Sequence, residues 1–136
     1  MFSLTTYPWW RRWFGTRSER AASQFLRGLG YRILEHNFSC ELGEIDLVAL
    51  DGKTIVFVEV RSTEAADTLQ PAHSVDAKKQ RKLTSLALYY LKRRGLLERS
   101  ARFDVLAISW PAGAATPTFA HFPNAFEPTG RLQMYS

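Results

Sequence analysis

Cysteine is nearly absent from this chain of 136 residues, in which Cys40 is the only one. A single cysteine excludes an intrachain disulfide and any zinc site built from several thiolates. Histidine is also scarce, and the three histidines, His36, His73 and His121, show neither an HExxH pattern nor a comparable ligand spacing. The sequence therefore predicts neither a disulfide-stabilised domain nor a zinc site of the common kinds.

The chain also lacks the patterns of several other protein classes. No apolar run reaches the roughly 18 residues that a membrane-spanning helix needs, and the N-terminus lacks the apolar centre of a signal peptide. We therefore expect a cytoplasmic protein without a membrane span. The GxxxxGK[ST], GxGxxG and GxSxG motifs are absent as well, which disfavours P-loop nucleotide hydrolysis and serine-hydrolase chemistry.

The composition is that of a globular protein, but its charges are unevenly distributed. A hydrophobic fraction of 46% and this length fit one domain with a real core. Residues 1–30 carry five arginines and one glutamate, residues 31–74 carry three basic against eight acidic side chains, and residues 75–95 carry seven basic side chains against one acid. An acidic centre between basic flanks suits a metal-dependent enzyme that acts on a polyanion. Solvated helix faces explain the same counts, so both interpretations stay open.

Hydrophobic periodicity and turn residues predict an α/β domain with a mixed sheet. The element order is α-β-β-β-α-β-(β), with the last strand short. The predicted helices cover residues 17–28 and 75–94, and the predicted strands cover residues 31–38, 43–50, 54–60, 102–109 and 119–122.

The domain spans residues 15–126 and has a short segment on either side. Residues 1–14 form an aromatic and basic N-terminal extension, which is suited to docking on the domain, to a membrane surface or to stacking on nucleic-acid bases. Residues 127–136 form a C-terminal tail.

The dipeptide Asp51-Gly52 is a strong hairpin signal between the second and third predicted strands. A loop over residues 51–54 places Asp46 directly opposite Glu59, whereas a loop over only 51–52 makes the two acids diagonal neighbours. Either register puts them on the same face of the sheet, because side chains alternate with period two. We therefore expect the two carboxylates to converge.

Acids on an otherwise apolar hairpin cost stability unless they are paired or bind a cation. Glu44 and Arg61 are predicted on the same face as Asp46 and Glu59. Two carboxylates plus water are typical ligands for Mg²⁺, so Asp46 and Glu59 form a candidate metal site. The alternative is that Arg61 neutralises Glu59 on a solvent-exposed face, and the residues alone leave both interpretations open.

Glu19 has two possible roles. The run Thr16-Arg17-Ser18-Glu19 fits a capping box, in which a glutamate reaches back to the first amide of a helix. In the alternative role, Glu19 leans over the sheet and joins the acidic cluster.

Several short motifs follow one another in a fixed order over residues 15–126. They are Gly15 with Glu19-x-x-Ala22, Gly30-Tyr31-Arg32-Ile33-Leu34-Glu35-x-Asn37-Phe38, Gly43-Glu44-Ile45-Asp46-Leu47-Val48, Phe57-Val58-Glu59-Val60-Arg61, Ala72-x-x-Val75-Asp76-x-x-Lys79-Gln80-x-x-Leu83, Arg102-Phe103-Asp104-Val105 and Pro123-Asn124-Ala125-Phe126. This combination resembles the bacterial YraN-like family. The resemblance implies a restriction-endonuclease-like PD-(D/E)xK fold, a mixed β-sheet flanked by helices, similar to the core of archaeal Holliday-junction resolvases.

The resemblance also implies roles for individual residues. Asp46 and Glu59 would be the metal-binding acids, Glu19 an accessory acid, and Gln80 a polar residue that reaches the site from the second helix. Arg61 stands where such nucleases usually have lysine. An arginine stays protonated and cannot act as a general base, but it can stabilise a phosphate or orient a water.

The leading hypothesis is a metal-dependent nuclease that hydrolyses DNA phosphodiesters with Mg²⁺ or Mn²⁺, in a structure-selective manner like a Holliday-junction resolvase. The basic residues predicted to hold the nucleic-acid backbone are Arg17, Arg20, Lys78, Lys79 and Lys82. The alternatives are a non-catalytic nucleic-acid-binding module of the same fold and a protein-interaction module. The sequence leaves a homodimer and a further protein partner open.

Overall fold

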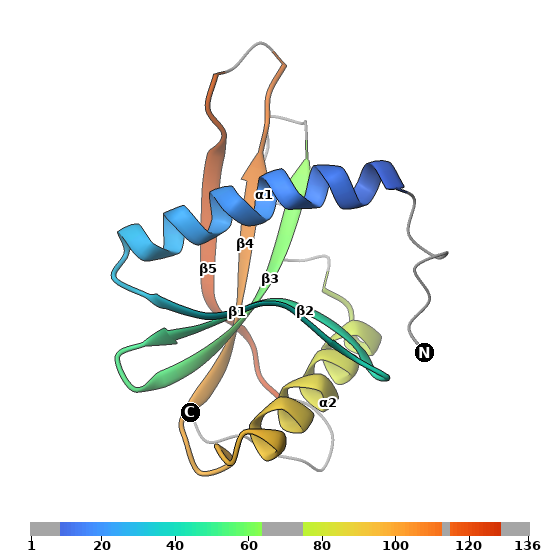
Figure 1. The fold of residues 1–136 in the computed structure, drawn as a ribbon, viewed down its shortest axis with the longest axis vertical. Coiled ribbons are helices and arrows are strands. Elements are labelled where there is room, and N and C mark those ends of the chain that lie inside the picture. The colour runs from blue at the N-terminus through green and yellow to red at the C-terminus, as the bar shows by residue number, and fades with distance from the viewer. Residues whose placement is uncertain (1–8, 64–74, 113–114, 129–136) are drawn as a thin grey trace.

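One mixed sheet of five strands, in the order β1-β2-β3-β4-β5, separates the two helices of this protein (Figure 1). The computed structural model describes residues 9–63, 75–112 and 115–128. The elements are α1 (Trp9–Gly28), β1 (Arg32–Cys40), β2 (Gly43–Asp51), β3 (Thr54–Thr63), α2 (Ala77–Arg93), β4 (Ala101–Ser109) and β5 (Thr118–Phe126). The α/β class, the mixed sheet and the predicted element order, including the last strand, are confirmed.

One parallel pair of strands makes the sheet mixed, and α2 forms the connection between these two strands. The pairs β1–β2, β2–β3 and β4–β5 are antiparallel, while β3 and β4 run parallel with Phe57 opposite Phe103. A parallel pair needs a long crossover between its strands, and α2 lies in that connection. Two-residue loops cannot make such a connection, so they are found only between antiparallel strands, as at Gly52-Lys53 in the β2–β3 hairpin.

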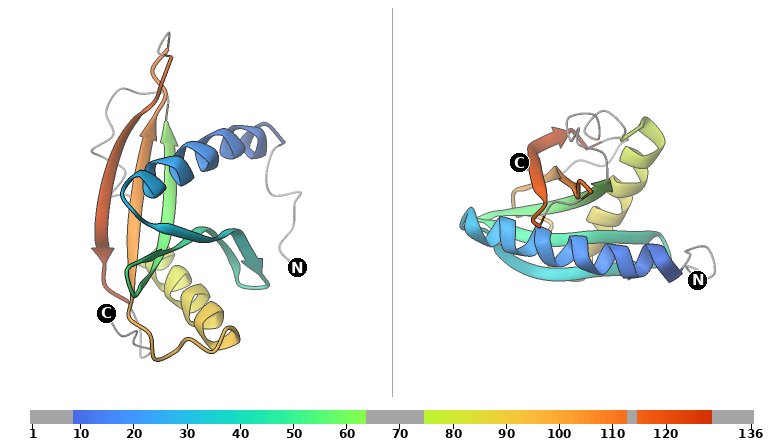
Figure 2. Two further views of the ribbon diagram at one scale, coloured as in Figure 1. Left: turned by 60° about the vertical axis from the view of Figure 1, so that its left-hand side comes forward. Right: turned by 90° about the horizontal axis from the view of Figure 1, so that it is seen from above.

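Each helix covers its own face of the sheet (Figure 2). Ala22 and Leu26 of α1 pack with one set of buried strand residues, which includes Val58. Leu83 and Leu86 of α2 pack with another set on the opposite face. Because β3 and β4 are covered on both faces, their sequences read as almost continuous apolar runs.

The first helix begins earlier than the sequence predicts. It starts at Trp9 rather than at residue 17, and Gly15 lies within it. A glycine inside a helix costs only about 1 kcal/mol relative to alanine, and arginine and aromatic residues do not interrupt a helix, so nothing in this stretch ends it. Part of the predicted N-terminal extension is therefore continuous with α1.

Several other boundaries differ, and some predictions lie outside the described residues. The strand β5 has nine residues rather than a short stretch near 119–122. Leu29, which directly follows α1, is half exposed. Residues 1–8, the loop residues 64–74 that include Pro71, and residues 129–136 of the tail are not among those described. No described helix is both long and apolar enough to cross a bilayer.

A buried ion-pair network joins β4 to β5 at an irregularity in their ladder. The register shifts between Phe103 and Val105, and the fully buried Asp104 fills the gap. Its carboxylate accepts hydrogen bonds from His121 Nε2 at 2.8 Å, from Arg102 Nε at 2.9 Å and from the Asn124 N–H at 2.9 Å. Burial alone would raise the pKa of Asp104, but these donors lower it below its usual range.

Replacing Asp104 with Asn should lower the free energy of unfolding near pH 7 by about 3–5 kcal/mol, because Arg102 and His121 lose a buried partner. The native pKa of Asp104 is lowered, so its contribution is complete above the ordinary value of about 3.9 and is lost as the pH falls through the native value. Urea unfolding of parent and variant from about pH 7 to about pH 3 should show a difference that shrinks with acid.

The exposed Glu98 offers a matched control for this experiment. The Glu98→Gln variant should stay within about 0.5 kcal/mol of the parent. A difference for Asp104→Asn that is the same at every pH would contradict the role assigned to the carboxylate charge.

Candidate active site

The strands β2 and β3 stop pairing at Asp46. Their register pairs Leu50 with Ile55, which is the first of the two registers that the sequence allowed, and the last ladder pair is Leu47 with Val58. Beyond it, the Val60 N–H donates to Asp46 Oδ2 at 2.8 Å. A side-chain carboxylate thus takes the place that a carbonyl of the neighbouring strand would have, and the β1–β2 hairpin bends away from β3 (Figure 1).

The alternation of side chains also breaks at this residue. Ile45 packs in the core on the α2 side, whereas Leu47, two residues on, packs in the core on the α1 side. On the neighbouring strand, Asn37 lies between the partners of these two residues and has φ 51°. A residue with a left-handed backbone conformation kinks a strand and reverses the alternation of side chains between the two faces of the sheet. Asp46 and Glu59 therefore come together where the strands separate, and not through the simple period-two argument.

Glu59 lies between two cations. Its Oε2 is 3.4 Å from Arg61 Nε and 3.4 Å from Lys79 Nζ of α2. The side chains differ in their access to solvent, because Glu59 is 11% exposed, Arg61 28% and Lys79 45%. Glu59 is thus largely buried, and Lys79 is the more exposed of its two cationic neighbours.

The surroundings of Asp46 disfavour its charged form more strongly than the hydrogen bond from Val60 favours it. Burial raises the pKa of Asp46, and the neighbouring Glu59 raises it further. The Val60 N–H lowers the pKa, but Glu44 and Glu19 add to the rise, which leaves it well above the usual range. Four carboxylates therefore share this region, and a bound cation would relieve their repulsion.

Glu19 reaches this region from α1. Its Oε1 accepts a hydrogen bond from Asn37 Nδ2 at 2.8 Å, and its charge raises the pKa of Asp46. The capping-box interpretation is wrong, because α1 begins at Trp9 and Thr16 lies inside the helix. Asn37 positions Glu19, a role that the sequence patterns did not predict. Its signal is an asparagine inside a predicted strand, since asparagine tolerates a positive φ better than most residues.

The second helix brings Lys79 to the acids rather than Gln80. Gln80 Nε2 donates to the Val75 carbonyl at 2.9 Å, so this side chain holds the start of its own helix. Asp76 caps α2 by accepting from the Lys79 N–H at 2.8 Å. These two contacts fix the first turn of α2 and with it the position of Lys79.

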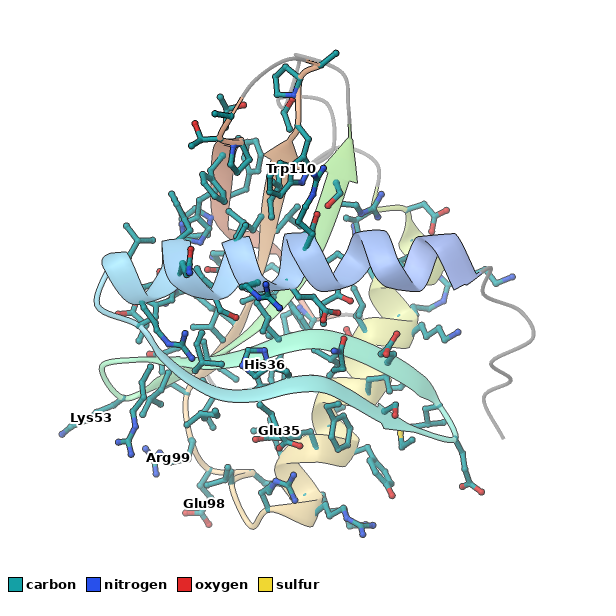
Figure 3. All side chains as sticks on the ribbon, turned by 45° about the horizontal axis from the view of Figure 1, so that its top comes forward. Glu35, His36, Lys53, Glu98, Arg99 and Trp110 are labelled. Atoms are coloured by element: carbon teal, nitrogen blue, oxygen red, sulfur yellow. The ribbon has the colours of Figure 1, made fainter. Side chains whose placement is uncertain are left out.

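The other basic residues predicted to bind a backbone lie on the two helices. Arg17 stacks over the Trp110 ring at 3.7 Å, and the Trp110 Nε1–H donates to the hydroxyl of Ser18, so this part of α1 is tied to the end of β4 (Figure 3). Arg20 of α1 and Lys78 and Lys82 of α2 are exposed.

Lys82 also covers the β1–β2 turn. A Cβ atom at Gly43, which has φ 140°, would lie 2.9 Å from Lys82 Cε. The lysine stem therefore packs on the turn while the residue as a whole remains exposed to solvent.

The donor set at the site fits a hard cation. Within residues 9–63, 75–112 and 115–128, no three His, Cys, Asp or Glu side chains are spaced to hold a metal ion. An ion here would have the two carboxylates of Asp46 and Glu59, with water and substrate phosphates completing its shell. Mg²⁺ is bound in this way, whereas structural zinc takes four nitrogen or sulfur ligands.

These features define an α/β domain with an enclosed acidic pair at a strand separation and basic side chains at its rim. The chain belongs to the uncharacterised protein family UPF0102, whose model matches residues 18–108. This match confirms the resemblance to the YraN-like family, and all the predicted acids of the site lie within it.

Relatives from several bacteria align with most of the chain. It is 46% identical over 113 residues to a UPF0102 protein of Geobacter sulfurreducens, which covers 83% of this chain and 88% of the relative. It is 51% identical over 98 residues to a UPF0102 protein of Moorella thermoacetica, with 72% of this chain and 82% of the relative covered. A UPF0102 protein of Rhodopirellula baltica is 43% identical over 124 residues, with 89% and 74% covered.

Replacing Asp46 with Asn should stabilise the protein near pH 7. The native pKa of Asp46 is raised, so stability falls as the pH rises from the ordinary aspartate value of about 3.9 through the native value, and the amide removes this penalty. Its Oδ1 can still accept from Val60. Thermal unfolding should show a higher Tm for the variant, by about 2–8 °C for each kcal/mol gained, and the gap should close near pH 4.

The exposed Glu41, in the turn between β1 and β2, provides a control for charge removal on the same hairpin. The Glu41→Gln variant should have the Tm of the parent. Adding MgCl₂ should raise the Tm of the parent more than that of Asp46→Asn, because only the parent keeps both carboxylates. An Asp46→Asn protein that is less stable than the parent near pH 7 would remove the electrostatic argument for a cation site.

Proposed function

We propose that this protein is a metal-dependent nuclease that hydrolyses phosphodiesters of DNA. The observation that carries the proposal is the meeting of Asp46 and Glu59 where β2 and β3 separate, with Lys79 and Arg61 beside them. Carboxylates that hold a cation next to side chains that hold phosphates are the parts that phosphodiester hydrolysis requires.

Asp46 and Glu59 would hold the metal ion. When bound, Mg²⁺ or Mn²⁺ supplies a Lewis acid that polarises the phosphate and lowers the pKa of water. Glu19 adds negative charge from α1, and its hydrogen bond with Asn37 keeps it at the kink of β1. Arg61 balances the charge of Glu59 within the site.

The reaction is a displacement at phosphorus. A water oxygen forms a bond to phosphorus, and the bond from phosphorus to one ester oxygen breaks with its electron pair remaining on that oxygen. The attacking water gives a proton to solvent, and the leaving oxygen takes one up as a hydroxyl group. The cations of the site would stabilise the negative charge that builds on the phosphate oxygens during this exchange.

Two further observations support the proposal. The sequence motifs of this chain resemble those of a family with an expected PD-(D/E)xK fold, and the observed order α-β-β-β-α-β-β with a parallel β3–β4 pair is compatible with that fold. Exposed basic residues on both helices, Arg20, Lys78 and Lys82, suit the backbone of a nucleic acid. A substrate with branched geometry, such as a four-way junction, is the form that the resolvase resemblance favours.

One observation favours a second candidate function. Glu59 already has two cationic neighbours in this structure, and Arg61 occupies the position where similar nucleases usually have lysine. A site neutralised by its own side chains is compatible with a nucleic-acid-binding module that does not cleave. Cleavage dependent on added metal separates the two candidates.

A cleavage screen should use linear, flapped and four-way-junction DNA with Mg²⁺ or Mn²⁺. We expect cleavage of at least one substrate, loss of cleavage in excess EDTA, and a decrease of about 10²-fold or more in the single-turnover rate for Asp46→Asn and for Glu59→Gln, since neutral amides bind these ions poorly. The Glu98→Gln variant should cleave like the parent.

Two results would count against the proposal in different ways. Cleavage that survives both amide substitutions, or that persists in EDTA, would point to another site or to a contaminant. A parent that binds DNA but cleaves none of the substrates would favour the binding module.

DNA binding should be broad in sequence and steep in salt. The double variant Lys78→Gln/Lys82→Gln should bind all DNA sequences more weakly, and each lost phosphate contact should reduce the slope of log Kd against log salt by about 0.9. Fluorescence anisotropy over a range of KCl concentrations measures both quantities.

A double variant with the same change in net charge is the control. Lys53 lies at the far end of the β2–β3 hairpin (Figure 3), and Lys92 lies at the opposite end of α2 from Lys78. Lys53→Gln/Lys92→Gln should bind nearly as the parent does. Equal losses in the two double variants would show a general charge effect and not an interface at the start of α2.

A further inference from the structure

We propose that Lys79 is a catalytic residue, whose ammonium group contacts a non-bridging oxygen of the scissile phosphate. This inference rests on the proposed function and deepens it. It assigns to the second helix the cation that the resemblance would place two residues after Glu59, where this chain has Arg61.

The first argument is geometric. Lys79 Nζ lies 3.4 Å from Glu59 Oε2, so its charge is held beside one of the two carboxylates that would bind the metal ion. A phosphate that binds beside Glu59 would meet the same ammonium group. Lys78 and Lys82, by contrast, are exposed neighbours that have no ion pair with the acids among the described contacts.

The second argument is the difference in access between the two cations. Arg61 is 28% exposed and its Nε is buried, whereas 45% of the Lys79 side chain is exposed. Lys79 has a flexible stem of four carbons and can turn from Glu59 toward a substrate without leaving the site. Arg61, the less exposed of the two cations, is better placed to balance the charge of Glu59 within the protein.

The third argument is that Lys79 stands where a cation costs stability. The first turn of α2 contains Lys78 and Lys79 and has no acidic residue. The N-terminal end of a helix carries a partial positive charge, so acids stabilise the first turn and lysines do not. The Asp76 cap and the Gln80–Val75 hydrogen bond fix this turn, and of its two lysines Lys79 is the one held beside Glu59.

Lys79 neither gives nor takes a proton in the proposed step. Its ammonium balances the charge that grows on the phosphate as water oxygen bonds to phosphorus and the ester oxygen leaves. In the absence of substrate and metal, the same ammonium neutralises Glu59. Lys79 therefore competes with the metal ion for Glu59, and this competition gives a readout that does not depend on cleavage.

The test compares Lys79→Gln and Lys79→Arg with Lys78→Gln, a predicted backbone contact, and with the control Lys92→Gln at the opposite end of α2, all in the full chain. Three quantities are measured: the Mn²⁺ dissociation constant without DNA, by calorimetry; the Kd for a labelled four-way junction in Ca²⁺; and the single-turnover cleavage rate in Mg²⁺. Circular dichroism confirms that each variant is folded, and Lys79→Arg tests the charge in case the glutamine variant is perturbed.

We expect Lys79→Gln to bind Mn²⁺ about fivefold more tightly, because one competing unit charge is removed from the site. Its Kd for the junction should change no more than that of Lys78→Gln, and its cleavage rate should fall about 10²-fold. Lys79→Arg should keep the Mn²⁺ affinity of the parent and recover most of the rate. The control Lys92→Gln, at an exposed position at the opposite end of α2, should leave both the Mn²⁺ affinity and the rate unchanged.

The failures of the two proposals give different results. If the parent cleaves but Lys79→Gln matches Lys78→Gln in all three measurements, Lys79 is one more backbone contact and only this inference is overturned. If Lys79→Gln loses Mn²⁺ affinity, Lys79 supports the acids and does not compete with the ion, which also overturns it. A parent that neither binds Mn²⁺ nor cleaves overturns the proposed function and this inference together.

Discussion

The hydrogen bond from the Val60 N–H to Asp46 Oδ2 is the contact on which the candidate site depends. It satisfies a strand amide at the point where β2 no longer pairs with β3, so the two strands can separate without leaving that amide unbonded. The separation lets Asp46 approach Glu59, and the kink at Asn37 brings Glu19 of α1 to the same place. A regular ladder through these residues would have closed the gap and removed the site.

Two aspartates solve the same backbone problem with opposite electrostatic results. Asp104 also fills a ladder irregularity and accepts from the N–H of an asparagine with φ 51°, Asn124. Arg102 and His121 surround it, so its pKa is lowered and its charge stabilises the fold. Asp46 has acids as neighbours, so its pKa is raised and its charge costs stability. A carboxyl group with a raised pKa among other acids, like that of Asp46, is typical of sites that bind a ligand. A carboxylate paired with cations, like that of Asp104, is typical of structural ion pairs.

The crossover between β3 and β4 gives the acids their basic neighbours. Because β3 and β4 are parallel, the chain has to return along the sheet through α2, and the start of that helix lies beside the strand that carries Glu59. The buried side of α2, from Leu83 to Leu91, fixes the helix on the sheet through apolar packing. The fold therefore places a lysine-rich helical turn next to the acidic hairpin, which unites the acidic centre and one of its basic flanks in space.

The sequence by itself determined the elements and their order, and it named the acids that are candidates for the site. Periodicity located both helices, and the Asp51-Gly52 turn identified the hairpin and limited its register to two alternatives, because these signals depend only on neighbouring residues. The structure decided between the two registers by pairing Leu50 with Ile55. The start of α1, the role of Asn37 and the choice between Lys79 and Gln80 were decided by the tertiary structure. Each depends on contacts between residues far apart in the chain: Glu19 meets Asn37 only after α1 packs on the sheet, and Lys79 meets Glu59 only after α2 docks. Local patterns carry no information on such distances, since it is the packing of whole elements that sets them.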